Sequence, residues 1–207
     1  SAMTPPRRSC HFRGSFGIGL VTFLTTLGLG CTAAAADRYL PAFPGAEGYG
    51  AFTPGGRGGK VLFVTTLDDY DPSEGEAPIP GSFRQAVETP GPRTVLFRVS
   101  GTIFLKSRLV VTQPFLTIAG QTAPGDGVCI ARCLFRIETH DVILRHLRFR
   151  LGDDTRSESG TFQLQNGRNV ILDHCSFSWS MDENCTLSGE EAGNLTLQWC
   201  LVAESLN

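Results

Sequence analysis

A four-residue phrase that recurs four times in the second half of the chain constrains its fold most strongly. The copies read Phe-Leu-Thr-Ile, Asp-Val-Ile-Leu, Asn-Val-Ile-Leu and Asn-Leu-Thr-Leu, and they begin at Phe115, Asp141, Asn169 and Asn194. Their first residues lie 26, 28 and 25 positions apart. A nearly constant period of about 20–50 residues is typical of proteins built from stacked structural repeats.

The second and fourth positions of the phrase are aliphatic in every copy. The two columns are Leu116, Val142, Val170 and Leu195, and Ile118, Leu144, Leu172 and Leu197. Alternate residues of a strand share one face, so both columns should point into the interior. A coil of this length cannot bury such a face alone and must stack on its neighbours. Leucine-rich repeats are the main rival, but their Leu-x-x-Leu-x-Leu spacing is missing. The pattern therefore predicts an all-β fold, a right-handed parallel β-helix.

Later columns of the same alignment place further residues on top of one another. His146, His174 and Trp199 share the sixth column, and Cys175 and Cys200 share the seventh. We expect the two cysteines to pack as small apolar residues, with a disulfide between neighbouring coils as the alternative. Five cysteines follow residue 36, and this odd number argues against a complete disulfide framework.

The first 36 residues have the pattern of a secretory signal peptide. Arginines at positions 7, 8 and 13 precede an apolar stretch over residues 16–30, and four alanines follow at 33–36. The stretch is short for a membrane span, and the alanines provide small residues for cleavage. We expect a secreted protein with no membrane association once the signal is removed. With 18 basic and 20 acidic side chains, the chain also has no charge excess that favours nucleic acid.

Residues 37–93 read as an N-terminal cap region and residues 94–207 as the coils of the β-helix. The cap region holds a glycine-rich stretch at 37–59, a strand at 60–66, an acidic loop at 68–80 and a short helix at 82–88. Ser82 and Gln85 have the spacing of a capping box, and Phe83, Ala86 and Val87 share one helix face. Such a helix can cover the open end of a coil stack. No corresponding cap follows the last strand, so we expect the β-helix to be incomplete.

The chain resembles the pectate lyases of polysaccharide lyase family 1, especially secreted bacterial members, and matches their N-terminal portion. The matching segments begin at Ala42 (AFPGAEGYG), Gly56 (GRGGKV), Gly81 (GSFRQAV), Pro92 (PRTVLFRVSGTI), Leu116 (LTIAGQTAPGDG), Arg145 (RHLRFR) and Asp173 (DHCSFSWSMDE). The resemblance implies a β-helix, export, and Ca²⁺-assisted β-elimination of polygalacturonate, an acidic polysaccharide. It also implies a monomer if the protein is complete.

The chemistry of this reaction indicates which residues a site needs. Removing the proton next to a uronate carboxylate is costly unless a hard cation neutralises that carboxylate. Acidic residues stand in the turn leaving the second coil, at Asp153, Asp154 and Glu158, and in the equivalent turn one coil later, at Asp182 and Glu183. Asp154 and Asp182 lie one repeat of 28 residues apart and could stack. We therefore expect a Ca²⁺ site from Asp182, Asp154 and Glu158, and the resemblance independently implies Asp182 as a ligand. Ordinary solvated turn carboxylates are the alternative.

Basic side chains should bind the neighbouring uronates, because arginine makes bidentate contacts with carboxylates. Arg145, Arg148 and Arg150 alternate with apolar residues and should point outward, and we expect Arg148 and Arg150 to bind substrate. A solvated basic face is an equal alternative. We expect His174 and its neighbour Asp173 to have a structural role rather than a catalytic one.

Three departures from the family pattern bear on activity. Gly160 stands where family members often have a calcium-ligating Asp, and Thr186 stands near a second carboxylate position, so Glu158 or Asp154 would have to substitute. The resemblance implies an arginine base on later coils, and no residue here matches it. We therefore expect this chain to be inactive alone, with no catalytic residue assigned. The alternatives are a non-catalytic polyuronate- or Ca²⁺-binding β-helix and, less favoured, a polygalacturonase-type hydrolase, which would need paired carboxylates.

Overall fold

The structure, a computed structural model, describes residues 40–154 and 159–206. The predicted signal peptide and Glu158 lie outside the described residues. Short strands dominate, with one α-helix and two 3₁₀ turns in the described part. They are β1 (Lys60–Val64), η2 (Pro72–Glu74), α2 (Phe83–Glu88), β2 (Arg93–Phe97), β3 (Gly101–Phe104), β4 (Leu109–Val111), β5 (Leu116–Ala119), η3 (Gly120–Thr122), β6 (Val128–Ala131), β7 (Phe135–Ile137), β8 (His140–Arg145), β9 (Leu147–Arg150), β10 (Phe162–Gln165), β11 (Arg168–Asp173), β12 (Ser176–Ser178), β13 (Cys185–Ser188), β14 (Gly193–Gln198) and β15 (Leu201–Val202).

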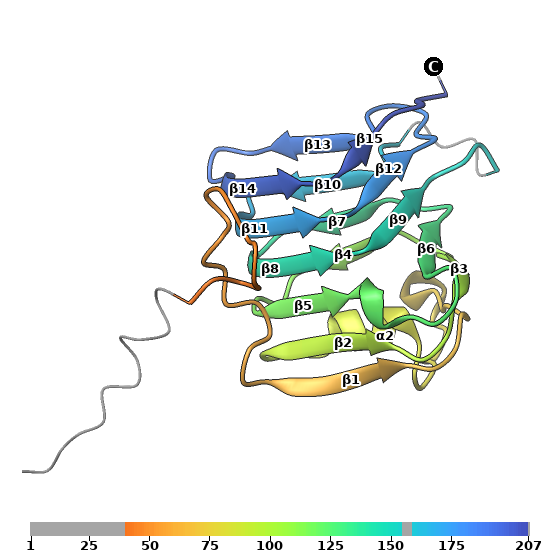
Figure 1. Cartoon of the computed structure of the whole chain (residues 1–207). Coiled ribbons are helices and arrows are strands. Elements are labelled where there is room, and N and C mark those ends of the chain that lie inside the picture. Colours follow the sequence, from red (N-terminus) through yellow and green to blue (C-terminus); the bar gives the residue numbers. More distant parts are fainter. Residues whose placement is uncertain (1–39, 155–158, 207) are drawn as a thin grey trace, which may run out of the picture. The chain divides into compact units, whose positions relative to one another are not determined.

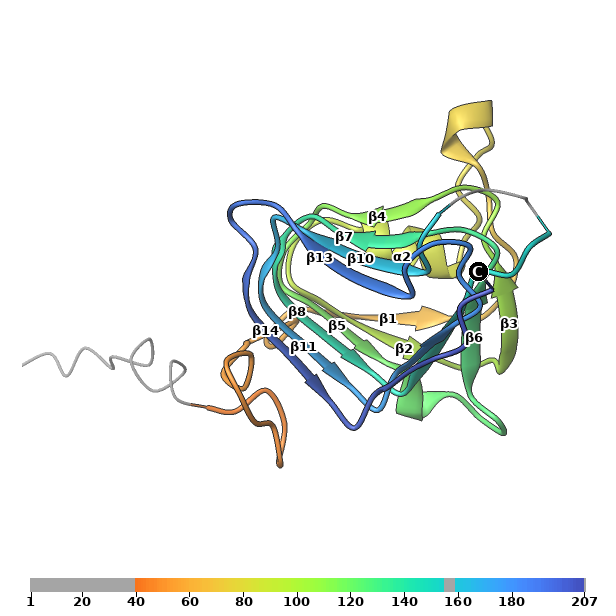
Figure 2. The ribbon, with the colours of Figure 1, turned by 90° about the horizontal axis from the view of Figure 1, so that it is seen from above.

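The strands form three parallel sheets that the chain visits in rotation. Sheet A has the order β1-β2-β5-β8-β11-β14, sheet B has β3-β6-β9-β12-β15, and sheet C has β4-β7-β10-β13. Every pairing within the sheets is parallel. Successive coils therefore stack along one axis (Figure 1), and the view along that axis shows the three sides of each coil (Figure 2). The predicted all-β parallel β-helix is confirmed. No helix in the described residues is long and apolar enough to cross a membrane.

The strand register reproduces the columns read from the sequence. In sheet A, Leu116 pairs with Val142, Val142 with Val170, and Val170 with Leu195. The first three members of both aliphatic columns are fully buried, whereas Leu197 at the end of the second column is 39% exposed. Aromatic rings continue the interior between sheets B and C, and the rings of Phe149 and Phe177 stack with centroids 5.1 Å apart. The interior is thus a set of ladders that run across the coils.

Helix α2 covers the interior near the first coils, as predicted. Phe83 has its ring centroid 5.8 Å from Phe97 and 6.1 Å from Phe135, within the buried core. The Ser82 hydroxyl accepts a hydrogen bond from the Gln85 amide, and the Gln85 side chain accepts one from the backbone N–H of Gly81. The capping box is therefore present, with its return bond displaced by one residue. Strand β1, from the region read as a cap, already pairs with β2 as part of sheet A.

The glycine-rich segment lies against the outer face of sheet A, a contact that was not predicted from its residues. We call residues 41–57 the N-terminal strap (orange in Figures 1 and 2). It packs Phe43 on Ile143 and Ile171, the outward third column of the repeat, and buries both isoleucines. The Thr53 hydroxyl donates to the carbonyl of Asn169 over 2.9 Å. With hydrogen bonds from Gly56 to Thr117 and from Gly50 to Thr196, the strap contacts four coils from outside, in addition to the core that joins them from inside.

Close contact with the sheet explains why glycine is needed in the strap. A Cβ atom added to Gly50 would lie 2.5 Å from the carbonyl oxygen of Val170, which is far inside van der Waals contact. The Gly50 amide donates to the Thr196 hydroxyl over 2.9 Å, so the strap cannot move away without losing a hydrogen bond.

Truncating an inner column should cost more stability than truncating its exposed end. Leu172→Ala removes buried atoms from the third coil and should lower the free energy of unfolding by about 2–5 kcal/mol. Leu197→Ala is the matched control in the same column, and its cost should be about 1 kcal/mol or less because the side chain is partly in solvent. Urea denaturation followed by circular dichroism measures both, and equal losses would contradict the described burial.

A methyl group at Gly50 should weaken the attachment of the strap. Gly50→Ala should destabilise the protein by about 1–3 kcal/mol, since backbone on both sides must shift. Gly193→Ala is the matched control, because a Cβ at that position would meet no atom within 4 Å. Thermal denaturation should separate the two variants. If neither substitution changed the melting temperature, the result would contradict the close contact between the strap and sheet A at Gly50.

Candidate functional site

The structure distributes the sequence-predicted site residues over three separate cavities. Asp182 lines a cavity of about 200 Å³, which we call the Asp182 cavity. Asp154 and Arg150 line one of about 320 Å³, the Trp179 cavity. Arg148 lines one of about 440 Å³, the histidine cavity. The carboxylates and arginines that were expected to form one site therefore line separate cavities, one on the sheet C side and two on the sheet B side of the coils.

The Asp182 cavity lies against the outer face of sheet C. Its lining residues are Leu134, Arg136, Ser159, Gly160, Gln163, Asp182, Glu183 and Thr186. Arg136 pairs in register with Gln163, and Gln163 with Thr186, so one outward column supplies three of these side chains. The two departures from the family pattern, Gly160 and Thr186, thus lie beside Asp182 and Glu183.

Hydrogen bonds between side chains and backbone hold the turn that carries Asp182, and they do not use the carboxylates of that turn. The Ser180 hydroxyl donates to the Asp182 carbonyl over 2.8 Å, and the Asn184 side chain accepts from the Ser180 amide and donates to the Ala203 carbonyl. The Asp182 and Glu183 side chains are both exposed. The turn therefore presents two acidic side chains from a fixed backbone.

Gly160 has a steric reason to be glycine in this chain. The Thr161 amide donates to the Glu183 carbonyl, which draws the two neighbouring turns together. A Cβ on Gly160 would lie 2.8 Å from that same carbonyl oxygen. An aspartate cannot take this position without moving the turn that presents Asp182 and Glu183.

Arg136 is a cavity residue that the sequence analysis missed. Its Nη1 pairs with the Glu138 carboxylate over 3.0 Å. Its Nε is buried and has no hydrogen-bond partner among the described residues. Arg136 stands between Phe135 and Ile137, which are both buried. This alternation of apolar and charged residues could have predicted that the Arg136 side chain points outward from sheet C.

Asp154 and Asp182, which the sequence suggested could stack, line different cavities, the Trp179 cavity and the Asp182 cavity. Strands β9 and β12 pair with an offset of 28 residues, as in Arg148 with Ser176, but β10 and β13 pair with an offset of 23, as in Phe162 with Cys185. The turn after β12 is thus five residues shorter than the turn after β9. Whether either carboxylate binds a metal stays a prediction, and Glu158 lies outside the described residues.

Arg150 points outward as predicted but is bonded to its own coil neighbours. Its guanidinium donates to the carbonyls of Phe149 and Ser176 over 2.8 and 3.1 Å and to the Ser176 hydroxyl over 3.0 Å. It also lies 5.6 Å from the ring centroid of Trp179. These contacts stabilise the stacking of β9 on β12 and leave fewer donors for a ligand.

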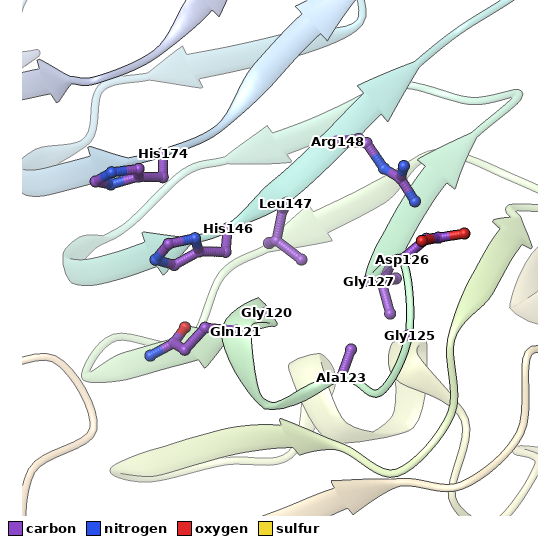
Figure 3. A pocket seen from close by; sticks show the side chains of 11 residues that line it. Gly120, Gln121, Ala123, Gly125, Asp126, Gly127, His146, Leu147, Arg148 and His174 are labelled. Atoms are coloured by element: carbon purple, nitrogen blue, oxygen red, sulfur yellow. The ribbon is translucent and has the colours of Figure 1, made fainter.

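The histidine cavity lies at the corner between sheets A and B (Figure 3). Arg148 lines it together with Asp126, His146 and His174, and the two imidazole rings stack with centroids 4.7 Å apart and planes 16° apart. The Trp199 ring follows at 6.3 Å from His174. The predicted sixth column is confirmed. In the seventh column, Cys175 is buried and Cys200 packs against the core. Both cysteines are free thiols, so they do not form the disulfide that was the alternative.

Asp173 anchors this corner from inside the protein. Its fully buried carboxylate accepts hydrogen bonds from Arg145 Nε at 2.7 Å, His174 Nδ1 at 2.9 Å and Gln198 Nε2 at 2.8 Å. Burial opposes its ionisation, but these hydrogen bonds outweigh burial and lower the pKa of Asp173. Its partners come from three successive coils, which agrees with the structural role expected for Asp173 and His174.

Comparison with known proteins relates the chain to pectate lyases. No protein-family model matches it. "Probable pectate lyase C" of Aspergillus flavus is 41% identical over 168 residues, which are 81% of this chain and 38% of that protein. The Emericella nidulans protein of the same name is 43% identical and covers 81% of this chain and 37% of its own length. "Probable pectate lyase 18" of Arabidopsis thaliana is 31% identical over 64% of this chain.

A solved structure supports the fold alone. The crystal structure of jun a 1, the major allergen from cedar pollen, has a TM-score of 0.58 and 24% identity, covering 72% of this chain and 46% of that one. The chain spans less than two fifths of the curated relatives' length. The resemblance to pectate lyases is confirmed, with one correction, since these relatives indicate the fungal rather than the bacterial type.

Removing the charge of Asp173 should destabilise the protein in a pH-dependent way. Asp173→Asn should cost about 1–3 kcal/mol at neutral pH, because the Arg145 guanidinium loses its charged partner. A lowered pKa in the folded state gives stability that is complete above the unfolded-state pKa of about 3.9 and is lost as the pH falls through the folded-state pKa.

The difference in unfolding free energy between the two proteins should therefore shrink below about pH 4. Urea denaturation at a series of pH values measures it. A difference that stays constant between about pH 7 and pH 2 would show that the Asp173 charge does not stabilise the fold.

Proposed function

Because the chain is a relative of the pectate lyases over 81% of its length, we propose that it acts on polygalacturonate, with Ca²⁺ as cofactor, as part of a secreted lyase. The observation that carries this proposal is the Asp182 cavity, in which two acidic side chains and an arginine face the same space on sheet C. An acidic polysaccharide needs both a cation and basic side chains to bind next to carboxylates.

The donor set of the Asp182 cavity fits Ca²⁺. It offers the carboxylates of Asp182 and Glu183, the amide of Gln163 and the hydroxyls of Ser159 and Thr186, and Ca²⁺ takes oxygen ligands of these kinds. Two carboxylates are few for such a site, so the uronate itself would supply further oxygens. Bound Ca²⁺ neutralises a uronate carboxylate and so lowers the cost of removing the adjacent proton.

Arg136 is the residue that we assign to uronate recognition in this cavity. The Arg136 side chain is 20% exposed toward the cavity it lines. Its Nε is buried and has no hydrogen-bond partner among the described residues, so this donor becomes available to a ligand only when the side chain moves. Arginine is suited to carboxylates because its planar donors match both oxygens. The pairing of Arg136 with Gln163 and Thr186 directs a bound polysaccharide along the outward column of sheet C.

Binding of polyuronate without cleavage is the second candidate function. This candidate follows if the arginine base that the resemblance implies has no counterpart in this chain, as the sequence suggests, because the donors of the Asp182 cavity could bind a cation and a carboxylate without a base. Incubation with polygalacturonate and Ca²⁺ separates the two functions. Absorbance of an unsaturated product that a chelator abolishes identifies a lyase, and retention on the polymer without product identifies a binding protein.

Removing the Asp182 charge should weaken Ca²⁺-dependent retention on polygalacturonate. Asp182→Asn should reduce the affinity by about tenfold, the equivalent of one lost charge-assisted contact. Asp154→Asn is the matched control, since Asp154 is also a turn carboxylate but lines the Trp179 cavity. Affinity electrophoresis with and without chelator measures both variants. A loss in Asp154→Asn with no loss in Asp182→Asn would assign the cation to the other cavity.

A further inference from the structure

Two histidines stand at equivalent positions of successive coils, where each coil turns from sheet A to sheet B. His146 follows β8 and precedes β9, and His174 lies between β11 and β12. Both adopt left-handed backbone, with φ of 53° and 54°. This conformation directs both side chains out of the corner, where they lie parallel (Figure 3). The stacking is thus set by backbone geometry repeated from coil to coil.

The hydrogen bond to Asp173 decides which nitrogen of His174 is free. The carboxylate of Asp173 accepts from His174 Nδ1 over 2.9 Å. A carboxylate only accepts, so Nδ1 carries the proton and the neutral ring keeps its lone pair on Nε2. The His174 side chain is 48% exposed, which leaves that side of the ring open to solvent. A carboxylate that orients a histidine in this way is a frequent second partner of metal-binding imidazoles.

His146 lies beside His174 in the histidine cavity, with the two ring centroids 4.7 Å apart. A metal ion needs a nitrogen lone pair from each neutral ring. One ligand atom from each of His146, Asp173 and His174 lies within 4.8 Å of the others. In the described residues, no other group of three or more His, Cys, Asp or Glu side chains is so close.

We propose that His146 and His174 bind one Zn²⁺ ion, or a similar divalent transition metal, at the corner between two coils. Imidazole nitrogen is a preferred ligand of these ions, and Asp173, already bonded to Arg145 and Gln198, orients His174 instead of ligating. The two rings are stacked nearly parallel, so they must tilt toward each other to hold one ion at the usual Zn–N distance of about 2.0–2.1 Å. Water completes the coordination. This site takes nitrogen ligands, unlike the oxygen-lined Asp182 cavity.

A metal at this corner would join neighbouring coils. His146 and His174 belong to successive turns of the solenoid, so an ion bound to both holds the β8–β9 corner to the β11–β12 corner. An ion that binds only the folded protein raises its stability with concentration. Free Zn²⁺ at 100 times the dissociation constant should raise the melting temperature by about 5–10 °C.

Zn²⁺ titration followed by imidazole ¹H–¹⁵N NMR tests the proposal on the full chain. Signals of His146 and His174 should shift together with one saturating ion of micromolar affinity. His146→Asn and His174→Asn should each weaken binding by about tenfold or more, and asparagine tolerates the left-handed backbone at both positions. His140→Asn is the matched control, because His140 also contacts a carboxylate, Asp141 at 2.6 Å, but has no imidazole stacked on it. It should bind as the wild type does.

Two results would overturn the proposal. One is saturation with Zn²⁺ that leaves the His146 and His174 signals in place, as binding to the free cysteines would. The other is equal affinity of the wild type and both corner variants. Melting of the metal-free variants shows whether they are folded. If either corner variant is unfolded, the wild-type NMR titration decides alone, since it needs no substitution.

Discussion

The in-register pairing of parallel strands is the constraint on which the rest of this structure depends. Each coil leaves one apolar face that only the next coil can cover, so the aliphatic columns through Leu172 and the ring stack of Phe149 on Phe177 exist only when the register is kept. The same register stacks the outward residues. Arg136 with Gln163 on sheet C and His146 with His174 at the corner are consequences of the pairing that buries the core.

The Asp182 cavity, our candidate binding site, lies next to turns that interrupt the regular pairing of the strands. Turns between sheets B and C differ in length from coil to coil, which brings the Glu183 carbonyl against Thr161 and opens the Asp182 cavity beside it. The corners that follow β8, β11 and β14 each have one left-handed residue at the same place, His146, His174 and Trp199. This repeated backbone stacks their side chains and favours a site built from repeated ligands such as His146 and His174.

Much of the fold could be predicted from the sequence, because the inner columns obey strict alternation and a steady period. The stacked histidines and the buried cysteine followed from the same alignment, and the capping helix followed from its capping box and its apolar face. The strap could not be predicted, since its contact between Phe43 and Ile171 joins residues far apart in the chain and glycine carries no partner preference. The site was predicted only in part. Asp182 and Asp154 stay predictions as Ca²⁺ ligands and line different cavities, and Arg136 was missed because its strand has only three residues.

The proposed function requires that a cation and a uronate meet in the Asp182 cavity. A crystal structure of the chain with Ca²⁺ and a short oligogalacturonate is the decisive measurement. We expect an ion with oxygen ligands from Asp182 and Glu183 and a sugar carboxylate in contact with Arg136. An ion and sugar bound instead beside Asp154 and Trp179, with the Asp182 cavity filled by solvent alone, would contradict it.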